Sequence, residues 1–295
     1  MDPHIIALVT ITLVAAVING GLGYGFSSIT VPLALLFLTN RTLNPALVLI
    51  EVVLNAWVLW VNRDALAVVW RRVLPIVAAL VPGVVAGTLI VSRVSPGWLK
   101  LWTYVTLLPL ILLQAAGFRR PIKAERALGV PFGLGLGVLY SVTTISGPPL
   151  ALLLNNQGLA KREFRAALGF IRLAESSFTA MAYLSAGLFT PSSMGLVPQI
   201  LPSVLIGVPI GARLIRKMPQ DTFRRICMSF DAWVVGFGVS TVLRDLKIVA
   251  GNGAFLFLLA VVMIDACLLY RFFSVGGRFN TPPADEGERR SALQH

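Results

Sequence analysis

The 295-residue chain has little charge, since Asp, Glu, Lys and Arg together supply only 13% of its residues. Soluble domains carry roughly a quarter. Hydrophobic residues supply 56%, and the mean hydropathy is +0.81. Several apolar stretches reach the roughly 20 residues that a helix needs to cross a bilayer. This composition excludes a large soluble domain and predicts an integral membrane protein whose surroundings are the lipid bilayer.

Cysteine and histidine are also scarce, with two residues of each. Cys227 and Cys267 fall in or beside predicted spans, without metal-ligand spacing or an evident disulfide role, so we expect buried free thiols. His4 and His295 lie near the chain ends. We therefore expect no metal site and no cofactor. No ATP-binding motif is present, which excludes pumping by ATP hydrolysis within this chain.

Acidic residues are few beside basic ones, 13 against 25, and the formal net charge is +12. The basic residues sit in short loops between predicted spans, which favours membrane orientation over nucleic-acid binding. The segments that connect the spans fall into two sets, one for each side of the membrane. Nineteen basic residues lie in one set and five in the other, and Arg172 lies inside a span. The positive-inside rule therefore puts the N-terminus outside and the C-terminus in the cytoplasm.

A weak internal repeat is the most informative pattern. Two hydrophobic stretches are interrupted, by glycines at 20–25 and by hydroxyl residues at 141–146, and each interruption leads into a short apolar segment. Three further matches occur in the same order along both halves. They pair residues 32–36 with 149–153, Glu51 with Arg172, and 83–87 with 207–211.

The predicted fold is all-α and spans the membrane. Helices are expected at 4–22, 27–38, 43–62, 71–92, 97–117, 125–142, 147–156, 164–186, 194–214, 222–242 and 250–271. The charge distribution requires 4–38 and 125–156 each to enter and return on one side. The chain then forms two inverted-topology repeats, 1–117 and 118–242, each a broken-helix hairpin plus three spanning helices. An extra span follows within 243–275, and a disordered cytoplasmic tail at 276–295.

The broken first helix followed by Pro32, the G-x-x-x-G span at 83–87 and the second copy of both resemble the TauE/SafE family over roughly residues 8–270. Members are also called sulfite exporters or sulfonate permeases. The second hairpin departs from the family pattern, because residues 143–148 are hydroxyl-rich where the family often has a Gly-rich turn. The resemblance implies transport of small sulfur oxyanions or organosulfonates, and we expect a bacterial-type cytoplasmic (inner) membrane.

Broken helices at matching positions indicate a transporter's binding site, and free N–H groups at their starts favour an anion. The two interruptions supply hydroxyls that either replace water around an oxyanion or cap the first helical turn. The predicted substrate-binding residues there are Ser27, Ser28, Thr30, Thr143, Thr144, Ser146 and Gly147.

Charged residues inside spans are the other candidates, because such charges are costly unless paired or hydrated. Arg172 either grips the anion or serves as a structural group, paired with Glu175 or reaching the cytoplasmic edge. Glu51 either carries a coupling proton or pairs with Arg172. Glu175 and Asp231 are further coupling candidates, whereas Asp265 lies on the extra span. Two amides, Asn19 and Asn55, are expected to line the pathway.

Together these patterns predict a secondary transporter, not an enzyme, that moves a small anion through a midplane site between two half-helix N-termini. Transport of the anion would be driven by a proton or Na⁺ gradient, or would follow the anion's own gradient by facilitated diffusion. One alternative is an intramembrane enzyme of the lipid-pyrophosphatase type, which needs clustered carboxylates for a metal, whereas the acids here are scattered. The other alternative is an anion channel with a hydroxyl-lined pore.

Overall fold

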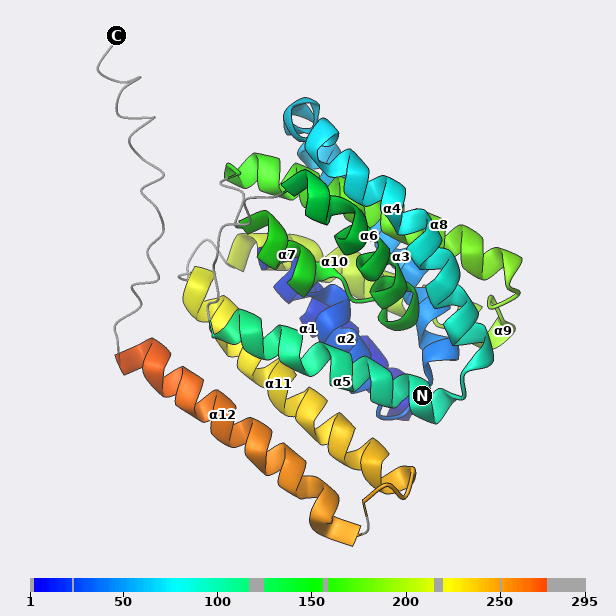
Figure 1. The fold of residues 1–295 in the computed structure, drawn as a ribbon, viewed down its shortest axis with the longest axis vertical. Helices are drawn as coiled ribbons and strands as arrows, with labels where there is room; N and C mark the ends of the chain where they lie inside the picture. The colour runs from blue at the N-terminus through cyan, green and yellow to red at the C-terminus, as the bar shows by residue number, and fades with distance from the viewer. Residues whose placement is uncertain are drawn as a thin grey trace.

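The computed structural model describes residues 3–22, 24–116, 125–155, 159–214, 220–249 and 251–274. Every regular element in these ranges is helical, so the all-α prediction is confirmed (Figure 1). The α-helices are α1 (Pro3–Leu22), α2 (Phe26–Ala34), α3 (Asn40–Val61), α4 (Leu66–Arg93), α5 (Pro96–Ala115), α6 (Glu125–Thr143), α7 (Gly147–Asn155), α8 (Lys161–Ser185), α9 (Pro191–Met194), α10 (Val197–Leu214), α11 (Gln220–Asp245) and α12 (Phe255–Ser274). Short 3-10 helices cover Arg63–Ala65 (η1) and Gly251–Ala254 (η3). The predicted tail at 276–295 lies outside the described residues.

Six helical segments of the described ranges are long and apolar enough to cross a membrane. They are Pro3–Gly21, Asn40–Val61, Arg63–Arg93, Pro96–Leu113, Pro191–Leu214 and Phe255–Ser274. The helices α8 and α11, with 25 and 26 residues, are also long enough but carry several charged residues each. The chain is therefore a multi-pass membrane protein in which two long helices bring charge into the helical bundle.

The first interruption ends α1 and starts α2. Gly25 has a φ of 109°, a left-handed conformation that costs glycine little and that turns the chain back on itself. After α2 the chain returns to the start of α1, where the rings of Phe37 and His4 stack with their centroids 5.4 Å apart. The pair α1–α2 is thus a hairpin whose two ends lie together, although α2 stops at Ala34 rather than at residue 38.

The second interruption separates α6 from α7, and polar side chains from other helices bond to the end of α6. Thr144 has a φ of 56°. The amides of Asn40 and Asn44 on α3 donate to the carbonyl of Val142, at 3.3 and 2.7 Å. The hydroxyl of Tyr183 on α8 donates to the carbonyl of Ser141. These bonds satisfy buried carbonyls at a helix end that would otherwise lack partners.

Glycines allow two helix pairs to approach very closely. A Cβ atom built on Gly211 of α10 would lie 1.8 Å from the carbonyl oxygen of Val17 on α1, and one on Gly83 of α4 would lie 2.2 Å from that of Leu134 on α6. Residues 83–87 and 207–211, which match each other in the two halves of the sequence, therefore both supply small-residue helix contacts. Gly135 of α6 differs, because nothing lies within 4 Å of a Cβ built on it.

The helix contacts join the two halves of the sequence throughout. Helix α1 packs along α10, α6 along α4, α3 along α8, and α5 along α11 (Figure 1). In the repeat, α1 corresponds to α6, α3 to α8, α4 to α10, and α5 to α11. If each helix is exchanged for its counterpart, the same four packed pairs result. Such a pattern is the one that a pseudo-twofold relation produces, and it supports our proposal of two inverted repeats.

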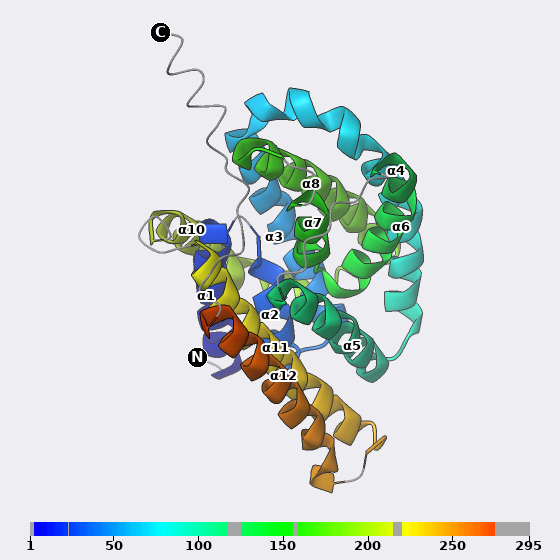
Figure 2. The ribbon, with the colours of Figure 1, turned by 60° about the vertical axis from the view of Figure 1, so that its left-hand side comes forward.

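The last helix, α12, lies beside α11 at the edge of the molecule in both views (Figures 1 and 2). Arg225 of α11 lies near the start of the span predicted at 222–242; it is buried and bonds to Asp265 of α12 at 2.9 Å. Ser229 and Trp233 of α11 donate to the same carboxylate. Cys267 on α12 is exposed, so its predicted burial is wrong, and the side chain of Cys227 lies outside the description.

Candidate functional site

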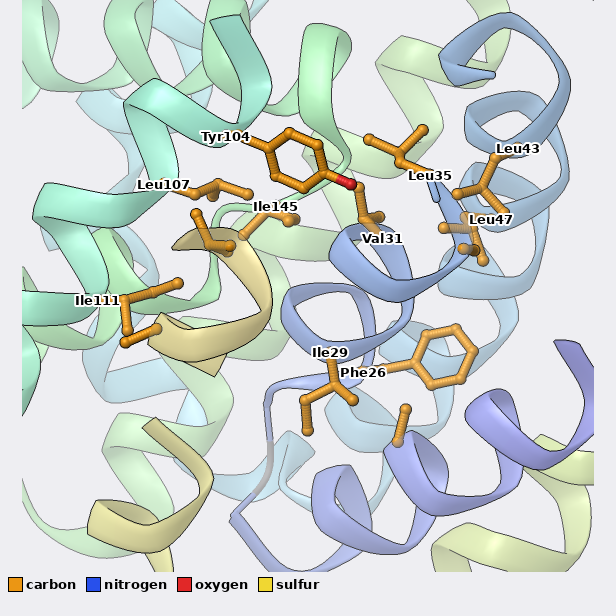
Figure 3. Packing of buried hydrophobic residues seen from close by; sticks show 14 of the residues in the cluster. Phe26, Ile29, Val31, Leu35, Leu43, Leu47, Tyr104, Leu107, Ile111 and Ile145 are labelled. Carbon is orange, nitrogen blue, oxygen red and sulfur yellow. The ribbon is translucent and has the colours of Figure 1, made fainter. Parts of the chain in front are cut away.

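The two helix interruptions meet inside the bundle. The ring of Tyr24, just before α2, lies against Gly147, the first residue of α7, where a built Cβ would be 3.4 Å from the Tyr24 Cδ2 atom. Ile145 of the second interruption packs in the same apolar cluster as Phe26 and Ile29 of α2 (Figure 3). The starts of the two short helices are therefore neighbours, as the repeat predicts.

Tyr104 of α5 fixes the position of α2 from the other side. Its hydroxyl donates to the carbonyl of Pro32 at 2.8 Å, and its ring lies over Gly238 of α11, which has no side chain to displace it. Figure 3 shows this ring pointing toward Val31 of α2 and toward Leu35, which directly follows α2. The short helix is thus held by apolar packing along its length and by a hydrogen bond near its C-terminal end.

Glu51 and Arg172 form a buried ion pair halfway along α3 and α8. The Nη2 atom of Arg172 lies 2.8 Å from Oε1 of Glu51, and both side chains are at most 3% exposed. The hydroxyl of Ser27 on α2 donates to the same oxygen at 2.5 Å. The hydroxyl of Tyr140 on α6 donates to Oε2 at 2.6 Å. Glu51 therefore has a cation and two hydroxyl donors, the partners that a buried carboxylate needs.

Glu175, one turn after Arg172 on α8, has fewer partners. Ser146, which directly precedes α7, donates to its Oε2 atom at 2.5 Å, whereas Oε1 is buried without a partner. Glu175 forms no ion pair in the described part of the chain. We call the set Ser27, Glu51, Tyr140, Ser146, Arg172 and Glu175 the central polar cluster.

Arg172 keeps donors that nothing in the described structure uses. The residue is 2% exposed, and its Nε and Nη1 atoms have no partner. The sequence left open whether Arg172 pairs with Glu175 or reaches the cytoplasmic edge. Instead it pairs with Glu51, the alternative considered for that residue. A guanidinium with unused N–H groups deep in a helical bundle is suited to gripping an anion.

The predicted hydroxyls divide into three groups. Ser27 and Ser146 bond to carboxylates of the central polar cluster. Three others bond to backbone close by: Ser28 to the carbonyl of Gly25, Thr143 to that of Leu139, and Thr144 to that of Thr143. Thr30 is buried, and its hydroxyl has no partner in the described residues.

The two short helices differ in the N–H groups that they offer. The first N–H groups of a helix have no partner within it. In α2 these belong to Phe26, Ser27 and Ser28, and no side chain caps this end. In α7 the first residue is Gly147, but Pro148 and Pro149 follow it, and proline carries no N–H. The start of α2 therefore offers more free backbone N–H groups than the start of α7.

The remaining predicted residues lie at varied positions. Asn19 and Asn55 are buried. Among the described residues, the Oδ1 atom of Asn19 and the Nδ2 atom of Asn55 have no hydrogen-bond partner. Asn55 lies one turn from Glu51 on the same face of α3. Asp231 is buried on α11, but no hydrogen bond or ion pair in the described structure joins it to the central polar cluster. No group of three or more His, Cys, Asp or Glu residues in the described ranges is arranged to hold a metal ion.

Sequence reasoning missed Tyr140 as a site residue. It directly precedes the second interruption, and it reaches Glu51 across 89 positions of the chain. Its place one turn before a predicted helix break was a usable signal, because polar side chains there face the gap between half-helices. The bond from Ser146 to Glu175 was also missed, although both residues were predicted separately.

Comparison with known proteins gives one match. The family model described as sulfite exporter TauE/SafE matches residues 8–237. No curated protein and no solved structure matches the chain. The matched range contains both interruptions and the whole central polar cluster, and it ends before α12.

Proposed function

We propose that this chain, which belongs to the sulfite exporter TauE/SafE family, is a secondary transporter that moves a small anion across the cytoplasmic membrane. The anion is a sulfur oxyanion or an organosulfonate. The observation that carries this proposal is Arg172, whose Nε and Nη1 atoms are buried without partners beside the starts of two short helices. The family is one of transporters, which favours transport over intramembrane enzyme chemistry.

The anion binds between Arg172 and the start of α2. The free N–H groups of Phe26, Ser27 and Ser28 point out of the helix start, where the helix dipole favours negative charge. Arg172 adds charge-assisted hydrogen bonds, which are stronger than neutral ones. On the other side α7 offers the N–H of Gly147 alone in its first three residues, so α2 supplies most of the backbone donors.

Glu51 has a positioning role in this proposal. It holds the Nη2 end of the guanidinium with support from Ser27 and Tyr140, which fixes the direction of the remaining donors. A guanidinium held in this way loses less entropy on gripping two oxygens of an anion than a mobile one does. The ion pair and the substrate role of Arg172 are then compatible, because they use different nitrogen atoms.

The close glycine contacts suggest which parts move together. Helices α1 and α10 form one tightly packed pair, and α4 and α6 form the other. Each pair carries one half-helix hairpin, since α2 follows α1 and α7 follows α6. In an alternating-access cycle we expect these pairs to move as units relative to α3 and α8, which carry Glu51 and Arg172.

Uptake into proteoliposomes tests the proposal. The purified protein is compared with protein-free vesicles for sulfite, thiosulfate, methanesulfonate and acetate, with and without a pH gradient. We expect saturable flux of at least one sulfur anion and its loss in Arg172→Gln. Arg93→Gln, which removes an exposed arginine at the end of α4, is the matched control and should keep the flux. Absence of flux for every anion would contradict the proposal, and unit rates far above carrier turnover would indicate a channel.

A further inference from the structure

The central polar cluster contains two carboxylates but one guanidinium. Arg172 bonds to Glu51 at 2.8 Å, and no basic group of the described residues lies within ion-pair distance of Glu175. With all three groups ionised, the cluster carries one net negative charge. A substrate anion entering between Arg172 and α2 meets that charge at short range and in a medium of low polarity, where repulsion is strong.

The two carboxylates differ in how well their charge is compensated. Glu51 accepts hydrogen bonds from Ser27, Tyr140 and the guanidinium, so both of its oxygens are satisfied. Glu175 accepts one bond, from Ser146, and its Oε1 atom is buried without a partner. A buried carboxylate stays ionised where it is paired, and takes up a proton where it is not. The geometry therefore separates Glu51, whose two oxygens have a cation and two hydroxyls as partners, from Glu175, which has one oxygen free to take up a proton.

Few other charged groups act on Glu175. Its near titratable neighbours are Arg172 on α8 itself, Glu51 on α3 and Tyr140 on α6. Helix α7 carries no titratable residue. The helix α4 and the short helix η1 also pack against α8, but their charged residues lie near the ends of α4 or in η1, away from its middle. These residues are Arg63, Asp64, Arg71, Arg72 and Arg93. The protonation of Glu175 therefore depends mainly on the cluster and on what binds in it.

We propose that Glu175 carries an exchangeable proton that the anion site requires, so that the anion and one proton bind together. This inference rests on the proposed transport function. One proton from water adds to a carboxylate oxygen of Glu175 when the anion enters, and it leaves when the anion leaves. No bond of the anion forms or breaks. By linkage, each ligand raises the affinity for the other by the same factor. A monovalent anion then moves without net charge.

Ser146 is placed to accept both states of Glu175. A hydroxyl donates one hydrogen bond and accepts others, so Ser146 can donate to the ionised carboxylate or accept from the protonated one. It directly precedes Gly147, the first residue of α7. Ser146 is therefore a positioning residue between the proton site and the start of the second short helix.

Calorimetric binding of methanesulfonate and thiosulfate to the purified protein tests the inference, because neither anion changes its own charge across neutral pH. In the wild type, affinity should fall about tenfold per pH unit over the range in which the carboxyl ionises. In the pH range where the affinity falls tenfold per unit, binding heats in buffers of different ionisation enthalpy should report one proton taken up per anion. Glu175→Gln mimics the protonated state, so at high pH it should bind the anion more tightly than the wild type and show no pH slope.

The controls separate the possible failures. Asp231→Asn removes another buried carboxylate outside the cluster and should keep the slope. A slope that persists in Glu175→Gln, or vanishes in Asp231→Asn, would overturn the inference. The proton count needs no variant, so a wild type that binds the anion without proton uptake would overturn it even if Glu175→Gln did not fold. If the wild type neither bound nor moved any anion tested, the proposed function itself would fail.

Discussion

Glu51 and Arg172 lie 121 positions apart in the chain, yet their side chains are joined by a buried bond of 2.8 Å. The same two positions match each other in the sequence alignment of the two halves. A negative and a positive residue at matching positions on α3 and α8 can neutralise each other only if those helices pack together, as they do here. This pair therefore ties the two halves of the chain to the candidate anion site.

Breaking the pair should separate its structural and binding roles. Arg172→Gln leaves Glu51 buried without its cation, and we expect a loss of about 3–5 kcal/mol in stability. Adding Glu51→Gln should restore much of that stability without restoring anion binding. Arg172→Lys should bind the anion more weakly, since an ammonium lacks the planar fork. Thermal unfolding in detergent and calorimetric binding on the same samples measure both effects. Wild-type anion affinity in a folded Arg172→Gln protein would exclude Arg172 as an anion ligand.

Alanine at the glycine contacts should be strongly destabilising. Gly211→Ala and Gly83→Ala put a Cβ 1.8 and 2.2 Å from a backbone carbonyl oxygen, so the helix pairs must separate. We expect each to cost at least the roughly 1–3 kcal/mol typical of overpacking. Gly135→Ala is the matched control. Gly135 lies on α6, the helix that Gly83 contacts, and the added methyl group there meets open space. Equal melting temperatures for Gly83→Ala and Gly135→Ala would contradict the packing argument.

Membrane orientation is tested by thiol labelling. In a background where Cys227 and Cys267 are replaced by serine, Ser192→Cys should react with an impermeant reagent added outside, because it lies in a segment without charge. Ala160→Cys, next to three basic residues, should react only from the cytoplasm. Both positions are exposed, so burial will not hide the thiol. Labelling of both from one face would refute the inverted topology.

The attachment of α12 depends on a second buried ion pair. Asp265→Ala leaves Arg225 buried without its carboxylate, and we expect a loss of about 3–5 kcal/mol. The double variant Arg225→Met with Asp265→Leu removes both charges and should recover most of the stability. Because α12 lies outside the range that matches the family, anion binding in the double variant should persist. Loss of binding in a stable double variant would show that α12 contributes to the site.

The sequence predicted the helices well because a membrane span is specified locally. Length, apolar content and glycine or proline interruptions predicted the described α-helices other than α9 to within a few residues at most ends, including the short helices α2 and α7. The sequence instead predicted a single span at 194–214, where the structure has α9 followed by α10. The charged candidates were also visible, since Glu51, Arg172 and Glu175 stand out in apolar surroundings. Such signals depend on residues close together in the chain.

The partners of these charges were less accessible. The sequence left two partners open for Arg172: Glu175, from the helical spacing of three residues, and Glu51, from the matching of the two repeats. Only the side-chain directions across the packed helices α3 and α8 decide for Glu51. Arg225 lies at the basic end of a predicted span, and only the position of α12 shows that it is buried and paired with Asp265. In both cases the deciding contact comes from a helix far along the chain, and an apolar sequence pattern does not encode it.

The paired prolines in the first turn of α7, Pro148 and Pro149, make the two halves of this molecule unequal at the starts of the two short helices. In the proposed carrier, a substrate facing one side of the membrane is held by a helix start rich in backbone donors, whereas the opposite side offers a start with few. Such a carrier half-saturates at different concentrations from its two faces. It still brings the same substrate to the same equilibrium, because unequal affinities on the two sides are balanced by unequal rates of reorientation.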